Sequence, residues 1–191
     1  MKGWMLIAAL LLGLIIGPSH AFAMECFDVE YPDTTTVDGQ KLVLNGMGLR
    51  PGPLGVKVYM AGAYVPKKSK SSKELLDLDV PKQVVITFMR DVSKKQVVKA
   101  YQQNLDRAPD AIRSKITKDY ENIMAKLQGA KKGDTQVFTY IPNEGLRIET
   151  LGKHRITITN PTTIEYFLGL YVGDNPRFDR MRDGIVTGNC K

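Results

Sequence analysis

The chain has 191 residues, of which 43% are hydrophobic and 25% are charged, and its 27 basic and 20 acidic residues give a formal net charge of +7. This length suffices for one domain with a hydrophobic core, and neither an internal repeat nor a low-complexity linker divides it. Nucleic-acid binding would require a basic stripe interleaved with aromatic residues. The one dense basic run, residues 67–73, contains none, so we predict no nucleic-acid partner.

The first residues have the features of a secretory signal peptide. Lys2 supplies a positive charge, an apolar run of 14 residues extends from Trp4 to Gly17, and Ala-Phe-Ala at residues 21–23 is typical of a cleavage site. A spanning helix requires roughly 20 apolar residues, which favours a cleaved signal over an uncleaved membrane anchor. We therefore expect residues 1–23 to be removed and residues 24–191 to form a single domain in the periplasm or outside the cell.

The two cysteines, Cys26 and Cys190, lie at opposite ends of the expected domain. An even count in an oxidising compartment favours one disulfide over two free thiols. The termini of a domain often lie close together, so the pairing is feasible. Closing so long a loop would stabilise the fold by on the order of 4 kcal/mol.

The first predicted elements after the signal are strands. Residues 41–44, 56–65 and 84–89 are rich in β-branched and aromatic residues and are bounded by Gly and Pro. The run Lys-Lys-Ser-Lys-Ser-Ser-Lys at residues 67–73 lies between two of these strands and is expected to be a solvated loop. The alternative is that this run contacts anionic lipid headgroups, so that the protein binds a membrane surface peripherally.

The first strand continues to Arg50, after which Pro-Gly-Pro at residues 51–53 predicts a turn. An arginine carried by a rigid strand into an apolar cleft is suited to hold an anion, because its planar guanidinium matches a carboxylate and remains charged. The alternative is a solvated arginine at the end of a strand.

Two helices are predicted next. Ser93 and Gln96 form the pattern of a capping box, and Val97, Tyr101 and Leu105 follow at helical spacing. A second helix is expected from Pro109, with an apolar stripe over residues 112–127 and an end at Gly129.

The rest of the chain predicts three more strands, at residues 136–141, 146–150 and 155–159, and then two more helices. Asn-Pro at 160–161 opens a helix that ends near Gly173, and Asn-Pro at 175–176 opens a last short helix before Gly184. The order of strands, helices, strands and helices predicts an α+β fold in which an antiparallel sheet carries helices on one face.

The sequence lacks the residues that several classes of chemistry require. His154 is the only histidine after the expected cleavage, and it lies in a predicted turn. A zinc site built on histidines requires more ligands, and a catalytic triad would depend on this one side chain. Gly46 and Gly48 precede Leu-Arg-Pro, so a dinucleotide-binding pattern lacks its third glycine. We predict neither a metal nor a cofactor.

Four segments in this order resemble the chalcone isomerase-like family and are most similar to its secreted bacterial branch. They are Leu-Asn-Gly-Met-Gly-Leu-Arg at 44–50, Lys-Val-Tyr-Met-Ala-Gly-Ala-Tyr-Val-Pro at 57–66, Lys-Gly-Asp and Tyr-Ile-Pro around the strand at 132–142, and Gly-Leu-Tyr-Val-Gly-Asp-Asn-Pro at 169–176. The resemblance implies an open-faced β-sandwich, in which a large antiparallel sheet is covered on one face by helices and a ligand cleft lies between them. In the plant enzymes of this family an arginine stabilises the phenolate and the developing enolate as a chalcone cyclises. Related members bind fatty acids through the same arginine.

The resemblance assigns roles to individual residues. Arg50 falls on the family's arginine, and Tyr59 falls near a threonine that contacts the substrate through water. Alternation along the strand places Tyr59 and Tyr64 on opposite faces, so only one of them can line the cleft. Asn104 matches a substrate-contacting asparagine if Lys-Gln at 95–96 is aligned with the family's Lys-Gln. That alignment puts Val97 where the plant enzymes have an active-site tyrosine.

Two further tyrosines, Tyr101 and Tyr166, are candidates for the ligand site, with plain core packing as the alternative. Together these residues favour a non-catalytic periplasmic binding protein, in which Arg50 pairs with the carboxylate of a fatty acid or similar amphiphile. The first alternative is a cofactor-independent intramolecular lyase, or isomerase, of a chalcone-like ketone, with Arg50 stabilising the oxyanion. Val97 lacks the hydroxyl that the plant enzymes use, which weighs against it. A cell-envelope interaction protein without a ligand is the second alternative.

Overall fold

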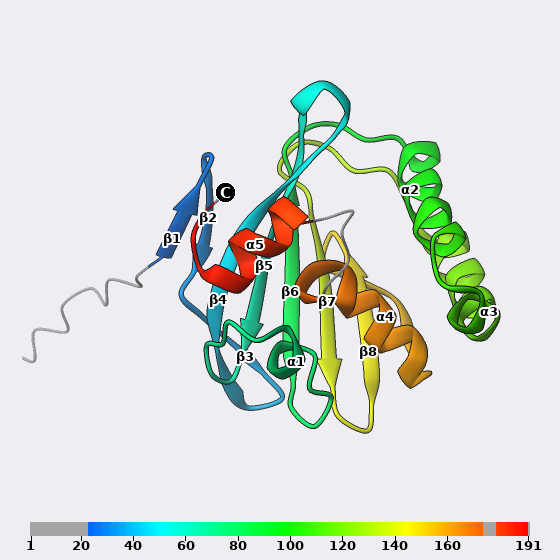
Figure 1. Cartoon of the computed structure of the whole chain (residues 1–191). Helices are drawn as coiled ribbons and strands as arrows, with labels where there is room; N and C mark the ends of the chain where they lie inside the picture. The colour runs from blue at the N-terminus through cyan, green and yellow to red at the C-terminus, as the bar shows by residue number, and fades with distance from the viewer. Residues whose placement is uncertain (1–22, 174–178, 191) are drawn as a thin grey trace, which may run out of the picture.

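The computed structural model describes residues 23–173 and 179–190 (Figure 1). The expected signal peptide, except Ala23, and the expected start of the last helix, Asn175-Pro176, lie outside these residues. The strands are β1 (Ala23–Cys26), β2 (Val29–Pro32), β3 (Thr34–Val37), β4 (Gln40–Pro51), β5 (Lys57–Val65), β6 (Lys82–Phe88), β7 (Thr135–Ile141), β8 (Gly145–Thr150) and β9 (Lys153–Ile158). The helices are α1 (Ser72–Leu75), α2 (Lys94–Asp106), α3 (Asp110–Lys126), α4 (Pro161–Val172) and α5 (Asp179–Thr187), and a short 3-10 turn, η1, covers Pro53–Gly55.

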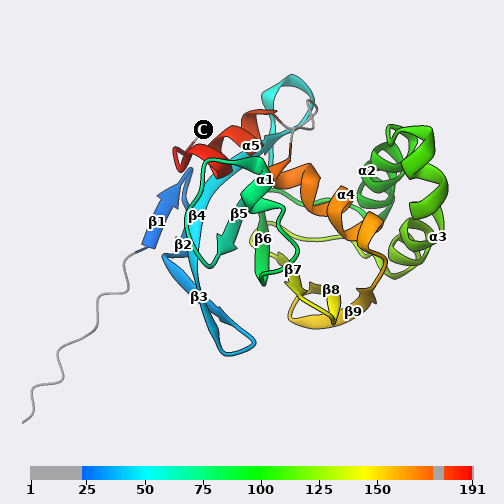
Figure 2. The same ribbon diagram turned by 60° about the horizontal axis from the view of Figure 1, so that its bottom comes forward.

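Seven strands form one antiparallel sheet in the order β3-β4-β5-β6-β7-β8-β9. Every strand pairs with its neighbour in the sequence, including β6 and β7, which pair although α2 and α3 intervene between them. Helices α4 and α5 cross one face of this sheet, and α2 and α3 pack beside α4 (Figures 1 and 2). The predicted α+β fold, an antiparallel sheet covered on one face by helices, is confirmed.

Alternation along β5 divides the core between the two faces of the sheet. Ala61 and Ala63 belong to the main core beneath the helices, whereas Met60 and Tyr64 belong to a second buried cluster on the other face. The hairpin of β1 and β2 covers that second cluster, and the hydroxyl of its Tyr31 donates to the carbonyl of Met60 at 3.1 Å. Tyr59 is therefore the tyrosine of β5 that faces the helices, and Tyr64 is not.

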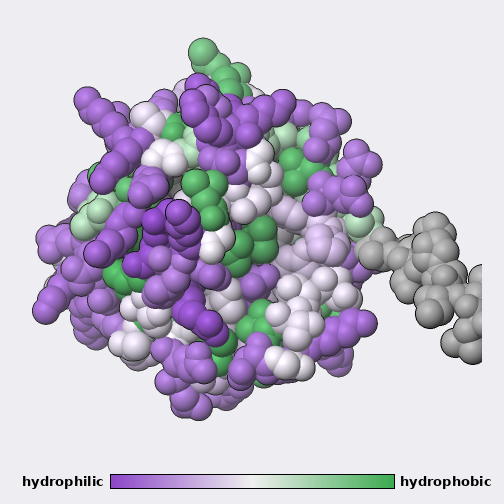
Figure 3. Space-filling model, turned by 180° about the vertical axis from the view of Figure 1, so that it is seen from behind, coloured by the Kyte–Doolittle hydropathy of each residue, from purple (hydrophilic) through white to green (hydrophobic). Residues whose placement is uncertain are grey.

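The other face of the sheet is open beyond the hairpin. Viewed from behind, it shows apolar and weakly polar residues across its centre and hydrophilic side chains around them (Figure 3). Val85 and Thr87 of β6 and Val137 of β7 are half-buried. The sheet is thus an open-faced sandwich, with its helices on one side only.

The two glycines of the Gly-Met-Gly segment allow α5 to lie directly on β4. A β-carbon at Gly46 would lie 2.5 Å from the carbonyl oxygen of Gly184, and one at Gly48 would lie 1.9 Å from that of Met181. The buried Asn45 adds a hydrogen bond from its Nδ2 to the carbonyl of Ile185 at 2.7 Å. These glycines provide close backbone packing, which no larger residue would permit.

The disulfide predicted between Cys26 and Cys190 is present, with their Cα atoms 5.7 Å apart. It joins β1 to the segment that follows α5, so both ends of the described domain are fastened on one side (Figure 1). Among the residues that the structure describes, no helix is long and apolar enough to cross a membrane.

Several local predictions are confirmed and others are wrong. The capping box of Ser93 and Gln96 is present, and Gly173 caps the end of α4. Helix α3 ends at Lys126, earlier than the predicted end at Gly129. Gly129 lies instead against the backbone of Val92, beside the β-bridge between Val92 and Ala130, and a β-carbon on it would approach the Val92 carbonyl oxygen to 2.8 Å.

Two regions contain elements that the sequence did not predict. The end of the lysine-rich run, expected to be a loop, contributes to helix α1, which the side chain of Ser71 caps. Strands β1, β2 and β3 have four residues each and were not predicted. Helix α5 extends to Thr187 rather than stopping before Gly184.

Candidate ligand-binding cavity

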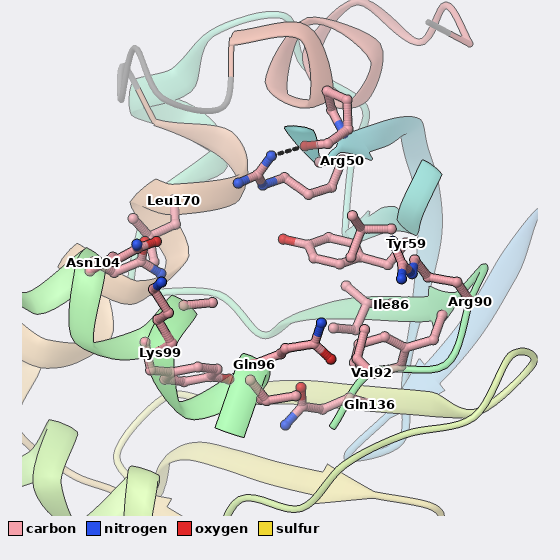
Figure 4. A pocket seen from close by; sticks show the side chains of 18 of the residues that line it. Arg50, Tyr59, Ile86, Arg90, Val92, Gln96, Lys99, Asn104, Gln136 and Leu170 are labelled. Atoms are coloured by element: carbon pink, nitrogen blue, oxygen red, sulfur yellow. Dashed lines mark hydrogen bonds between the residues drawn. The ribbon is translucent and has the colours of Figure 1, made fainter. Parts of the chain in front are cut away.

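A cavity of about 560 Å³ lies between the sheet and helices α2 and α4, at the end of the sheet where β4 turns into β5 (Figure 4). Its walls come from β4 and the following turn, from β5, β6 and the start of β7, and from both helices. Three cationic side chains line it, Arg50, Arg90 and Lys99, and no acidic residue is among the described residues of its walls. The volume is within the range of small-molecule sites.

Arg50 and Tyr59 form one wall of the cavity. They are direct cross-strand partners on β4 and β5, so their side chains leave the sheet on the same face. Figure 4 shows both extending from the sheet into the cavity, toward Asn104 and Leu170 on the helices. Arg50 is half-buried, and its guanidinium donates to the carbonyl of Pro51, which holds the group at the cavity wall.

Three tyrosines, Tyr59, Tyr101 and Tyr171, line the cavity. Tyr171 shares a side-chain hydrogen bond with Tyr59, and Tyr59 packs edge-on against Phe88 with ring centres 6.1 Å apart. Burial raises the pKa of Tyr171 and of Tyr101, and the nearby hydroxyl of Tyr59 raises both further. These phenols therefore remain neutral near pH 7, where they can donate hydrogen bonds to an anion and cannot act as bases.

Tyr101 lines the cavity and has a buried hydroxyl. This hydroxyl has no hydrogen-bond partner of normal geometry in the described part of the chain. The buried amide of Gln136 is near enough to lower the pKa of Tyr101 a little, against the larger effect of burial. A buried hydroxyl without a partner is costly, so this atom is suited to a polar group that enters the cavity.

The remaining predicted site residues differ in position. Asn104 lines the cavity from α2. Tyr166 does not line it; its hydroxyl donates to the backbone carbonyl of Asn104 at 2.7 Å, and so it fastens α4 to α2 at the cavity edge. Val97, at the position aligned with the tyrosine of the plant enzymes, is buried and lines the cavity, where it supplies no hydroxyl.

Several polar lining residues were missed in the sequence, among them Arg90, Lys99 and Gln136. Arg90 follows β6 much as Arg50 ends β4, and Lys99 belongs to a polar row on α2 with Gln96 and Gln103 at helical spacing. That row, beside the apolar stripe of the same helix, was the available signal. Gln136 gave none, because a single amide at the start of a strand is ordinary.

Other sites are not supported in the residues that the structure describes. No group of three or more His, Cys, Asp and Glu side chains lies together as a metal site would require. His154 is exposed on the edge strand β9 and is not among the lining residues.

These observations define a class of protein: an open-faced α+β sandwich that has a cavity with an arginine between its sheet and its helices. A family model described as chalcone isomerase-like matches residues 23–186, and the chain therefore belongs to the chalcone isomerase-like family. A comparison with curated protein sequences found no match.

Among solved structures, the chain is similar to the crystal structure of the fatty-acid binding protein AtFAP1 of Arabidopsis thaliana. The TM-score is 0.68 at 16% sequence identity, and the match covers 85% of this chain and 94% of that chain. At this level of identity the similarity shows that the two proteins share a fold.

Proposed function

We propose that this chalcone isomerase-like protein binds a fatty acid or a similar amphiphilic carboxylate without transforming it, after export to the periplasm. The observation that carries the proposal is the pairing of Arg50 with Tyr59 at one wall of a cavity that has three cations and no described acidic residue. The signal-like segment at residues 1–23 supports export. The fatty-acid binding function named for the similar Arabidopsis structure supports the ligand class.

The energetics favour a carboxylate head at Arg50. A hydrogen bond between an ionised donor and an ionised acceptor contributes about 1.5 to 3 kcal/mol, and each buried methylene of a tail adds about 0.8 kcal/mol. The apolar walls suited to the tail are contributed by Ile86, Val97, Phe167 and Leu170. Tyr59, the cross-strand partner of Arg50, can donate a hydrogen bond to the second carboxylate oxygen.

The test combines a change in the protein with a change in the ligand. Titration calorimetry on delipidated protein would compare a fatty acid with its methyl ester, for the wild type and for Arg50→Met. The wild type should prefer the acid, and Arg50→Met should bind the acid roughly 10- to 150-fold more weakly while binding the ester about equally well. Arg147→Met is the matched control, because Arg147 is exposed on β8 and pairs with Glu144 at 3.5 Å outside the cavity.

Two results would contradict the proposal. Equal affinity of the wild type for acid and ester would exclude a carboxylate anchor at Arg50. Conversion of a chalcone to a flavanone above the uncatalysed rate would contradict the non-catalytic part. Val97 supplies no hydroxyl, and burial keeps Tyr101 and Tyr171 neutral near pH 7, so we expect no such conversion.

A further inference from the structure

The turn between β4 and β5 holds large apolar side chains in solvent at the mouth of the cavity. Residues 51–53 line the cavity, and Leu54 immediately beyond them is fully exposed, at 103% of its reference area. Val56 is 41% exposed in the same turn. Figure 1 shows this turn projecting beyond the end of the sheet. Nothing in the core requires a leucine at this place.

Two further turns repeat this arrangement. The large apolar residues exposed in the described part of the chain are Phe27, Leu54, Val56 and Leu151. Phe27 is in the β1–β2 turn, where its ring lies under the ammonium group of Lys57 at the start of β5. Leu151 is in the β8–β9 turn. It follows Thr150, which pairs with Gln136 near the start of β7. Strand pairing therefore places these turns at the same end of the sheet as the cavity.

The backbone at three of these residues makes their exposure more notable. Phe27, Leu54 and Leu151 have φ values of 50°, 57° and 54°, in the left-handed region. Bulky apolar residues rarely adopt this conformation, which glycine, asparagine and aspartate adopt at lower cost. The other described non-glycine residues with positive φ are aspartates or an asparagine. Three turns thus retain an apolar side chain where the local conformation favours a small or polar one.

Several cations lie at the same end of the sheet as these apolar side chains. Lys57, Arg90 and Lys99 are exposed at this end, and Arg180 lies in a shallow pocket with Phe27 and Lys57. Two acidic residues also lie here: Asp28 adjoins Phe27 in the same turn, and Asp91 is paired with Lys131 at 2.8 Å. Apolar side chains at protruding turns together with nearby basic residues are typical of proteins that insert shallowly into an anionic bilayer surface.

We propose that this end of the sheet, the apolar-turn end, docks on an anionic lipid bilayer, with Leu54 and its neighbours in the headgroup region and the cavity mouth facing the membrane. Docking itself requires no ligand. Direct exchange of an amphiphile between bilayer and cavity is its functional consequence, and that part rests on the proposed function. Lysines 67, 68, 70 and 73 lie beyond the opposite end of β5, where the described residues expose no large apolar side chain, so they do not form this surface.

Vesicle co-sedimentation tests the docking. The wild type should bind vesicles of equal parts phosphatidylcholine and phosphatidylglycerol, bind pure phosphatidylcholine more weakly, and lose binding as salt is raised. Leu54→Ser should weaken binding roughly tenfold or more, because it removes an inserted leucine, and it should fold normally since Leu54 has no buried contacts. The double change Lys67→Gln and Lys68→Gln is the control and should alter binding less than about twofold.

Three outcomes would overturn the docking proposal. The first is that the wild type does not bind vesicles, which would leave a protein as the partner of this surface. The second is that Leu54→Ser binds vesicles as well as the wild type does. The third is that the Lys67/Lys68 control loses as much vesicle binding as Leu54→Ser does. Transfer of a fluorescent fatty acid from vesicles to protein then tests exchange: Leu54→Ser should slow transfer without changing affinity for a soluble short-chain acid. If vesicles bind and no acid does, the ligand proposal fails and the docking surface remains.

Discussion

Replacing Gly48 by alanine would test how α5 is seated on β4. The new β-carbon would lie 1.9 Å from the carbonyl oxygen and 2.6 Å from the carbonyl carbon of Met181. Both atoms belong to the backbone, so no side-chain rotation can relieve the clash. Carbon and oxygen normally approach to about 3.3 Å, so the helix must retreat by more than about 1 Å.

The retreat would break contacts along the whole interface. Gly46 and Gly184 touch the facing backbone, and the hydrogen bond from Asn45 to the carbonyl of Ile185 would be stretched from 2.7 Å beyond a useful length. Overpacking costs about 1 to 3 kcal/mol, and an orphaned buried polar group costs about 1 to 3 kcal/mol. We expect Gly48→Ala to lower the free energy of unfolding by about 2 to 5 kcal/mol and Tm by roughly 4 to 20 °C.

Urea and thermal unfolding followed by circular dichroism would measure the change. Gly169→Ala is the matched control, because Gly169 lies within α4 and a β-carbon there meets no atom within 4 Å. It should be neutral or stabilising by up to about 1 kcal/mol, as alanine is the better helix former. A Gly48→Ala protein as stable as the wild type would refute the close seating of α5 on β4.

Two further predictions concern stability. Burial lowers the pKa of Lys82 from 10.5 to about 8, so between these pH values the unfolded state binds more protons and the free energy of unfolding should rise with pH, by at most about 3 kcal/mol. Above pH 10 the free energy of unfolding should fall, because burial raises the pKa of Tyr64 to about 12 and the tyrosine of the unfolded chain ionises first. Urea titrations from pH 7 to pH 11 should show the rise in the wild type and not in Lys82→Met, and parallel curves would contradict the assignment. Removing the disulfide that links Cys26 and Cys190 across 164 residues, by reduction or by a double change to serine, should lower the free energy of unfolding by about 2 to 5 kcal/mol. A reductant that leaves the wild-type urea midpoint unmoved would contradict this stabilisation.

Local periodicity in the sequence predicted much of the fold. The alternation of β5 placed Tyr59 and Tyr64 on opposite faces, and the capping box at Ser93 marked the start of α2, because each depends on residues only a few positions apart. Strands β1 to β3 were missed because four-residue strands have little pattern of their own, and they are ordered by distant partners, as when Tyr31 packs on Gly62.

The site was predicted less completely than the fold. Arg50, Tyr59, Tyr101 and Asn104 all line the cavity, whereas Tyr166 supports its edge. Arg90, Lys99 and Gln136 are lining residues because helix and strand ends far apart in the sequence meet there, and only Lys99 belongs to a local pattern, the polar row on α2. Whether these side chains hold a ligand stays a prediction for the titrations described above.

The sequence alone determined the class of fold, the pairing of the cysteines and an arginine suited to an anion, since each follows from spacing, composition or family pattern. Tertiary structure decided what the Gly-Met-Gly segment does: its glycines admit a helix more than 130 positions away in the chain. It also decided which turns share one end of the sheet. Both results depend on strand register and on backbone contact between distant segments, which no local pattern of residues encodes.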